Sequence, residues 1–225
     1  MTQLTTLGLA YVMEAHEKEL CSSIGKMEHL RHLHLFASSS LIKTDALSSA
    51  PPYLEKLFLN GKLEKVPHWF NGLHSLTYLT MQGSQLGEDL LSHIQALPNL
   101  SYLSLGDNAY NQEQLCFLEG FQKLRRLRIF CFDLLNEIVI EKHVMPYLRA
   151  LRVDRCKELR GFLPYGLDHL THLEKVNLYD VSDKLVERVC REMNISHCPT
   201  TQGIILNRAD EDDEAGCEWF HNFIY

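Results

Sequence analysis

Large aliphatic residues recur along this 225-residue chain in one short pattern, L-x-x-L-x-L, with Ile, Val or Met as occasional substitutes. The pattern occurs eight times, and the first leucines of its copies are Leu4, Leu30, Leu54, Leu76, Leu100, Leu124, Leu148 and Leu173. Successive first leucines are 26, 24, 22, 24, 24, 24 and 25 residues apart. Eight copies at a near-constant spacing indicate a repeat architecture, because chance matches in a leucine-rich chain do not keep a period.

The second and third apolar positions of each copy are two residues apart, so on an extended strand both side chains point to the same side. One repeat cannot bury these side chains alone, whereas stacked repeats form a continuous core. About a dozen residues then return the chain to the start of the next strand, which makes neighbouring strands parallel. The sequence therefore predicts an α/β leucine-rich-repeat solenoid, a horseshoe of about eight repeats with a parallel β-sheet on its concave face.

The two ends of the chain differ from the repeats. Residues 1–181 are predicted to form the solenoid, and residues 182–225 a helical cap followed by an acidic and aromatic tail. Ser182 or Asp183 should cap a short helix with one apolar face, which would close the last repeat. The run Asp210–Glu214 is expected to be solvated, and the aromatic terminus to pack on the cap or to serve as a docking segment. A repeat that begins at Leu4 leaves an uncovered edge, so we expect a fragment or a truncated gene product.

Charge and composition exclude several functions. Residues 191–225 hold two basic and seven acidic side chains, a net charge of −5 out of −7 for the whole chain. The remaining near-neutral body argues against nucleic acid as a partner, because phosphate binding needs a cationic surface. No apolar stretch is long enough to span a membrane, and no secretory signal is recognisable. Seven cysteines without a C-x-x-C pair favour reduced thiols and a cytoplasmic location.

Nothing in the sequence supports catalysis, a cofactor or a metal site. No Ser/His/Asp or Cys/His arrangement has a recognisable local signature. His32 and His34 would share one strand face and could bind zinc, but no further ligands follow at a fixed spacing, so a solvent-facing polar pair is the preferred interpretation. Cys156 and Asn108 occupy a turn position at which buried polar groups satisfy backbone donors. We therefore expect a non-enzymatic chain.

Motif positions three, five, seven and eight should face solvent on the concave surface. Arginine and aromatic residues gather there, and these residue types carry most binding energy at protein interfaces. An acidic partner would gain orientation and association rate from such a patch. The alternatives are docking of the chain's own tail or of a missing domain, and a merely solvated charge ladder. The candidate partner-binding residues are Phe58, Tyr78, Tyr102, Arg126, Arg128, Phe130, Arg152, Arg155 and Lys175.

Three stretches carry a more specific resemblance. Residues 23–35, SIGKMEHLRHLHL, resemble a repeat of plant intracellular nucleotide-binding leucine-rich-repeat disease-resistance proteins. Residues 54–79, with L-x-x-V-P-H-W-F in their middle, and residues 156–173 are similar to the same family, so the resemblance covers roughly residues 20–190. It implies a repeat domain of innate immunity that senses pathogen effectors or modified host proteins and restrains an ATP-driven switch. The phosphate loop of that switch, G-x-x-x-x-G-K-[ST], does not occur in this sequence.

The expected partner is accordingly a protein: an effector, a guarded host protein, or the nucleotide-binding domain of the same receptor. Two alternatives remain open. One is a free-standing intracellular leucine-rich-repeat scaffold in signalling. The other is the substrate-recognition part of a ubiquitin ligase, which calls for a helical ligase-binding motif and for cysteine at position nine of the repeats; only Cys156 meets the second condition.

Overall fold

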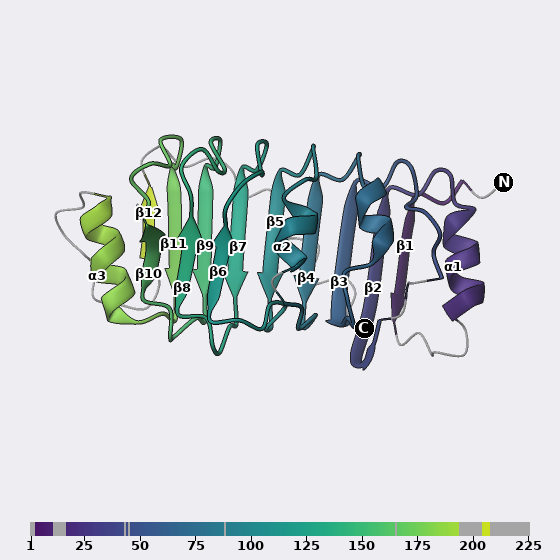
Figure 1. The fold of residues 1–225 in the computed structure, drawn as a ribbon, viewed down its shortest axis with the longest axis horizontal. Coiled ribbons are helices and arrows are strands. Elements are labelled where there is room, and N and C mark those ends of the chain that lie inside the picture. Colours follow the sequence, from purple (N-terminus) through teal and green to yellow (C-terminus); the bar gives the residue numbers. More distant parts are fainter. Residues whose placement is uncertain are drawn as a thin grey trace.

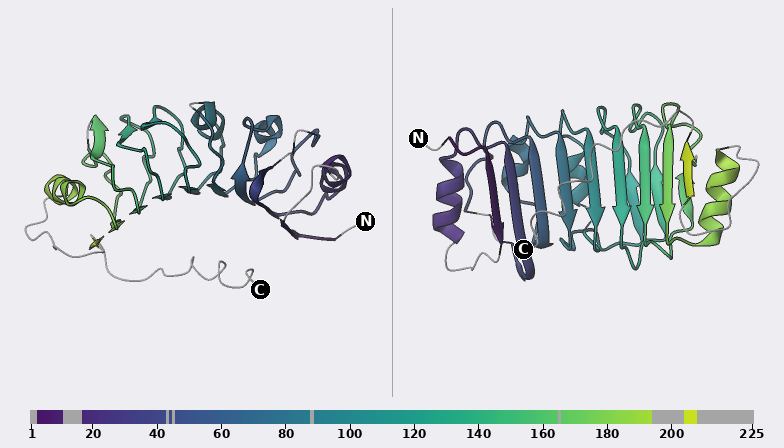
Figure 2. Two further views of the ribbon diagram at one scale, coloured as in Figure 1. Left: turned by 90° about the horizontal axis from the view of Figure 1, so that it is seen from below. Right: turned by 180° about the vertical axis from the view of Figure 1, so that it is seen from behind.

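The computed structural model describes residues 3–10, 17–42, 44, 46–87, 89–164, 166–193 and 204–207. They form a curved solenoid in which a long sheet lines the inner side and helices or short strands line the outer side (Figures 1 and 2). The fold is the predicted leucine-rich-repeat horseshoe.

The inner sheet has one strand for each predicted repeat. Each strand pairs in parallel with the next, and position three of one motif lies opposite position three of the following motif, as in Tyr78 opposite Tyr102 opposite Arg126. The eight strands are β1 (Thr6–Ala10), β2 (His32–Leu41), β3 (Lys56–Lys62), β4 (Tyr78–Gln82), β5 (Tyr102–Gly106), β7 (Arg126–Phe130), β9 (Ala150–Asp154) and β11 (Lys175–Tyr179). The leucine period therefore predicted both the number of these strands and their parallel pairing.

A ninth strand closes the carboxy-terminal edge of the sheet. Strand β12 (Ile204–Asn207) pairs antiparallel with β11, with Asn207 opposite Lys175. Strand β12 lies within the segment predicted as cap and tail, and no copy of the leucine motif predicts it. The predicted boundary after residue 181 stays a prediction.

The outer side changes from helices to strands along the solenoid. Its first part carries α1 (Glu17–Gly25), the 3-10 helix η2 (His68–Gly72) and α2 (Asp89–Ile94). Strands β6 (Gln114–Phe117), β8 (Glu137–Ile140) and β10 (Gly161–Pro164) then form a second, parallel sheet. Alternating apolar residues such as Ile138 and Ile140 fit this sheet, because they point inward while their neighbours face outward. The sequence pattern predicts return segments here but not a second sheet.

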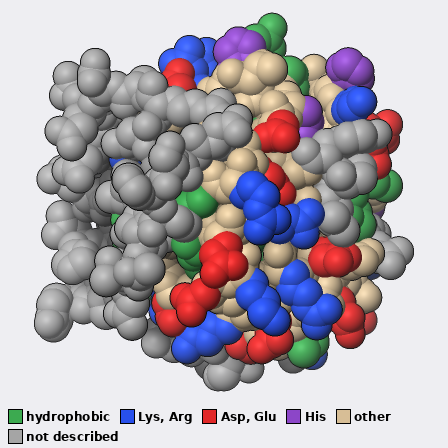
Figure 3. Space-filling view, turned by 90° about the vertical axis from the view of Figure 1, so that its left-hand side faces the viewer, with side chains coloured by type: hydrophobic (Ala, Val, Ile, Leu, Met, Phe, Trp, Pro, Cys, Tyr) green, Lys and Arg blue, Asp and Glu red, His purple; other side chains and the backbone are tan. Residues whose placement is uncertain are grey.

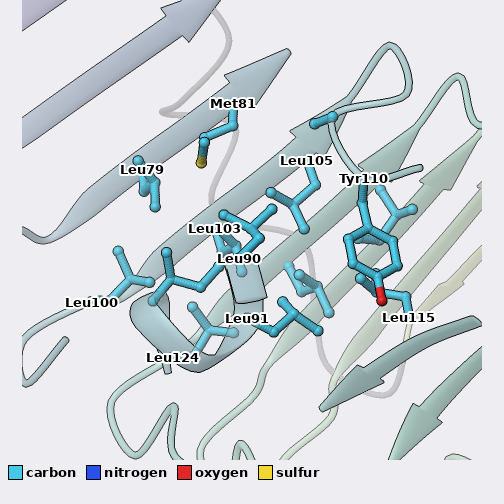
Figure 4. Packing of buried hydrophobic residues seen from close by; sticks show 14 of the residues in the cluster. Leu79, Met81, Leu90, Leu91, Leu100, Leu103, Leu105, Tyr110, Leu115 and Leu124 are labelled. Carbon is cyan, nitrogen blue, oxygen red and sulfur yellow. The ribbon is translucent and has the colours of Figure 1, made fainter. Parts of the chain in front are cut away.

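One continuous hydrophobic core runs between the two sides. Figure 4 shows Leu103 of β5 and Leu124, which precedes β7, in the same hydrophobic cluster as Leu90 and Leu91 of α2. Every first leucine from Leu30 to Leu173 is buried, whereas Leu4 beside the edge strand β1 is 41% exposed. Each fully buried leucine contributes roughly 1.5–3 kcal/mol to stability, so stacked repeats supply most of the folding energy.

Position eight of the motif turns the chain out of the strand. In six consecutive repeats the residue at position eight has a positive φ, which ranges from 46° at Asp180 to 140° at Gly61. These residues are Gly61, Gly83, Asp107, Cys131, Arg155 and Asp180. At Gly61 a Cβ atom would lie 2.5 Å from the carbonyl oxygen of Ala37, so the site suits only glycine. Position eight therefore lies in the turn at the strand exit and not within the sheet, and Arg155 at this position stays exposed.

Helix α3 (Asp183–Glu192) follows the last parallel strand. The hydroxyl of Ser182 accepts a hydrogen bond from the Leu185 amide, which confirms the predicted cap. Figure 3 shows Lys and Arg side chains interleaved with Asp and Glu on this end of the molecule. Cys190 is disulfide-bonded, which contradicts the expectation of reduced thiols throughout. The acidic and aromatic residues 208–225 lie outside the described residues, and no helix in the described ranges is long and apolar enough to cross a membrane.

Candidate partner-binding surface

The inner sheet presents every second residue to the concave side. In β7, Leu127 and Ile129 are buried in the core, whereas Arg126 is exposed and Arg128 half-buried on the opposite side. Because the strands are in register, positions three and five of all repeats form two rows across the sheet. None of these sixteen residues is acidic, so the concave face is positive in a chain of net charge −7.

Three arginines surround one carboxylate at the carboxy-terminal part of this face. Arg152 Nη2 donates to Asp154 Oδ2 at 3.3 Å, and Arg155 Nε donates to Asp154 Oδ1 at 3.3 Å. Arg128 Nη2 lies 3.7 Å from Asp154 Oδ2. We call Arg128, Arg152, Arg155 and Asp154 the arginine cluster. One negative charge among three positive ones leaves the cluster with a net charge of +2, which suits it to an anionic group of a partner.

Aromatic rings hold two of these guanidinium groups against the sheet. The Arg128 guanidinium carbon lies 4.3 Å from the centre of the Phe130 ring, and that of Arg152 lies 4.7 Å from the Tyr179 ring. The Nε atoms of Arg128 and Arg152 are buried, and in the described part of the chain neither has a hydrogen-bond partner. The stacking holds both guanidinium groups in place, and 25% of the Arg128 side chain and 36% of the Arg152 side chain stay exposed.

Phe130 supports the cluster from below and is not itself a contact residue. The motif pattern predicts a solvent-facing Phe130, but this residue is only 5% exposed. Its ring lies over Gly106 in the neighbouring strand, where a Cβ atom would come within 2.1 Å of ring carbons. The missing side chain of Gly106 thus makes room for Phe130, and the ring of Phe130 then carries Arg128.

Four stacked rings cross the amino-terminal part of the same face. The ring centres of His34 and Phe58 are 4.0 Å apart, those of Phe58 and Tyr78 5.0 Å, and those of Tyr78 and Tyr102 4.0 Å with nearly parallel planes. We call these four residues the aromatic ladder. Burial and the neighbouring Tyr102 raise the pKa of Tyr78 far above 10, so its hydroxyl stays protonated at physiological pH.

The predicted site residues therefore fall into two adjoining groups. Phe58, Tyr78 and Tyr102 lie in the aromatic ladder, while Arg128, Arg152 and Arg155 lie in the arginine cluster. Arg126 and Lys175 lie at position three of their strands, beside the cluster. Neither Asp154 as the centre of the cluster nor His34 as the first ring of the ladder was predicted from the sequence. The parallel register was the available signal for His34, because it places this residue directly opposite Phe58.

The turn residues and histidines have structural contacts. Asn108 Oδ1 accepts the Asp133 amide at 3.0 Å, which confirms the predicted role of that side chain. The Cys156 thiol also has backbone hydrogen-bond partners: it donates to the Asp154 carbonyl at 3.5 Å and has a hydrogen bond with the Phe132 backbone, and burial raises its pKa to about 11. The His32 ring shares a hydrogen bond with the Thr6 hydroxyl at 3.3 Å. Among the described residues, no three His, Cys, Asp or Glu side chains are grouped to hold a metal ion.

The aromatic ladder should make stability depend on pH. Burial, followed by the charges of His32 and Lys56, lowers the pKa of His34 below 6.5. A histidine with a lowered folded pKa contributes stability that is present above its unfolded pKa, about 6.5, and is lost as the pH falls toward the folded value. Urea unfolding should therefore show lower stability at pH 5.5 than at pH 7.5. His34→Phe keeps a ring against Phe58 and should reduce this difference; an unchanged difference would assign it to other groups such as His32.

Comparisons with known proteins agree with this architecture. The family described as leucine-rich repeat region matches residues 1–196. Disease resistance protein RPM1 of Arabidopsis thaliana is 42% identical over 198 residues, which are 87% of this chain and 21% of the relative. The probable disease resistance RPP8-like protein 4 of the same plant is 25% identical over 213 residues, 91% of the chain and 23% of the relative. The chain thus spans about a fifth of the length of the curated relatives it matches.

Proposed function

Since this chain belongs to the leucine-rich repeat region family and is related to plant disease resistance proteins, we propose that it is the protein-recognition part of an innate-immunity receptor or of a truncated relative. In this role the chain binds its partner in the cytoplasm and catalyses no reaction. The partner is a protein: a pathogen effector, a guarded host protein, or the nucleotide-binding domain of a receptor.

One observation carries the proposal. The concave face places the arginine cluster beside the aromatic ladder, outside the core and without an acidic residue at positions three or five. Arginine and aromatic side chains supply most binding energy at interfaces, and fixed guanidinium groups select carboxylates. The surface therefore suits a partner that presents acidic side chains next to an apolar or aromatic one.

A charge-reversal experiment tests the proposal on the full chain. Arg126→Glu combined with Lys175→Glu changes two concave cations without removing a member of the arginine cluster or the ladder. The matched control combines Lys123→Glu with Arg160→Glu, two exposed cations outside the inner sheet. Immobilised chain is exposed to plant leaf extract, and the retained proteins are quantified by mass spectrometry.

We expect the concave variant to retain its acidic partner about tenfold less than the wild type does, because the loss of attraction is compounded by repulsion. Retention by the control variant should match that of the wild type, and raising the salt concentration should reproduce the effect of the concave variant. If the concave and control variants retain the same proteins in the same amounts, the concave face is not the recognition surface.

A further inference from the structure

Strand β12 sets the point from which the last residues of the chain start. Its final residue, Asn207, lies opposite Lys175, the first residue of β11. The chain therefore continues beyond Asn207 from the carboxy-terminal edge of the inner sheet, next to the positive part of the concave face. The next strands along the sheet are β11 with Lys175, β9 with Arg152 and Asp154, and β7 with Arg126 and Arg128.

The sequence beyond Asn207 matches the concave face in the order of its chemical groups: acidic residues come first, and aromatic residues follow. The acidic run Asp210–Glu214 begins three residues after Asn207. Four aromatic residues follow it, 12 to 18 residues after Asn207: Trp219, Phe220, Phe223 and Tyr225. Across the sheet from β12, the cationic strands come first and the aromatic ladder on β5 to β2 comes next.

The distances match as well as the order. Neighbouring strands are about 4.8 Å apart, so β9 and β7 lie roughly 10 and 14 Å from β12, and β5 to β2 lie roughly 19 to 34 Å from it. An extended chain covers at most about 3.3–3.6 Å per residue, so residues 210–214 can reach ~10–25 Å from Asn207. Residues 219–225 can reach at least ~40 Å, which includes the whole aromatic ladder.

We propose that the segment Asp210–Tyr225 binds the concave face of its own chain. Its acidic run pairs with the arginine cluster, Arg126 and Lys175, and its aromatic residues pack on the aromatic ladder. An external partner must then displace this segment before it can bind. The proposal extends the function assigned to this surface, but the contact itself requires no external partner.

The segment and the concave face carry opposite charges and belong to one chain. The segment from Asp210 to Glu214 has a charge of −5, and the arginine cluster with Arg126 and Lys175 has a charge of +4. Because the segment is tethered at Asn207, its effective concentration at the face is of millimolar order, so weak contacts are enough to keep it bound. A separate protein with the same charge pattern would need a far higher intrinsic affinity to occupy the concave face to the same extent.

The two tryptophans allow a direct test on the full chain. Trp69 is buried in the core, where its indole donates to the Thr44 hydroxyl, so it reports on the fold, while Trp219 reports on the segment. With 5-fluorotryptophan incorporated, the fluorine NMR spectrum should contain two resonances, which Trp219→Phe assigns. We expect the Trp219 resonance to lie away from that of solvent-exposed fluorotryptophan in the wild type. In 1 M salt, and in the Arg126→Glu and Lys175→Glu variant, it should move to the solvent-exposed position.

The Trp69 resonance should stay in place in every variant, and the Lys123→Glu and Arg160→Glu control should leave both resonances unchanged. Reversing two tail charges, Asp210→Lys and Asp212→Lys, should release Trp219 in the wild-type background and restore its contact in the Arg126→Glu and Lys175→Glu background. A Trp219 resonance that is solvent-like in the wild type, or that ignores the concave substitutions, would overturn the proposal.

Partner binding separates this inference from the proposed function. Replacing the five acidic residues 210–214 by their amides should increase the affinity for the external partner about tenfold, because the binding-competent fraction rises. If affinity does not change while Arg126→Glu and Lys175→Glu still weakens partner binding, the self-contact is refuted and the recognition surface stands. If Arg126→Glu and Lys175→Glu change neither the Trp219 resonance nor partner binding, the self-contact and the recognition surface are both refuted.

Discussion

Replacing Asp154 by alanine is expected to lower the free energy of unfolding by about 3 kcal/mol, because it leaves three guanidinium groups without their shared counter-charge. The Asp154 side chain is only 12% exposed, and it bonds to Arg152 and Arg155 on the same face. Urea unfolding followed by circular dichroism measures the loss. Glu174→Ala is the matched control: its exposed pair with Arg149 at 3.9 Å should contribute less than about 1 kcal/mol.

The isosteric change Asp154→Asn separates stability from recognition. It keeps the shape of the side chain but raises the net charge of the arginine cluster from +2 to +3, so stability should fall while affinity for an acidic partner rises. A variant that simply misfolds would lose both properties together. Parallel losses of stability and affinity in a variant with a native circular dichroism spectrum would contradict an anion-binding role for the cluster.

The leucine period predicted the inner sheet because one spacing determines two properties. Leucines two residues apart must point to the core together, and a constant repeat length then aligns each strand with the next. The outer side follows no such period. Leu115 and Phe117 in β6 could anchor a loop, a helix or a strand equally well, so the second sheet depends on how neighbouring returns pair and was not predicted.

The candidate site was predicted to the extent that it follows from register. Position three of one repeat pairs with position three of the next, which brings Tyr78 and Tyr102 together. The roles of Phe130 and Asp154 depend on contacts between particular residues of different strands. Phe130 is buried because Gly106 has no side chain, and Asp154 gathers three arginines from two strands and a turn. The sequence of a single repeat does not show these contacts, because they join residues of different repeats.

Leu103→Ala should be the most destabilising core substitution considered, with an expected loss of about 3–4 kcal/mol. Leu103 is fully buried in β5, at the middle of the inner sheet, and its strand partners are Leu79 and Leu127. In a solenoid each repeat contacts only its neighbours, so a cavity here weakens the connection between the two halves as well as one repeat. The urea transition should therefore move to a lower concentration and also become broader.

Leu7→Ala makes the same chemical change in the edge strand β1, where the side chain is only partly buried and has a strand neighbour on one side. The expected loss is about 1 kcal/mol, because less apolar surface returns to water and the chain can relax around a smaller cavity. Hydrogen exchange should show faster opening confined to the first repeats for Leu7→Ala, and faster opening on both sides of β5 for Leu103→Ala. Equal losses from the two substitutions would mean that burial by stacked neighbours does not determine stability in this fold.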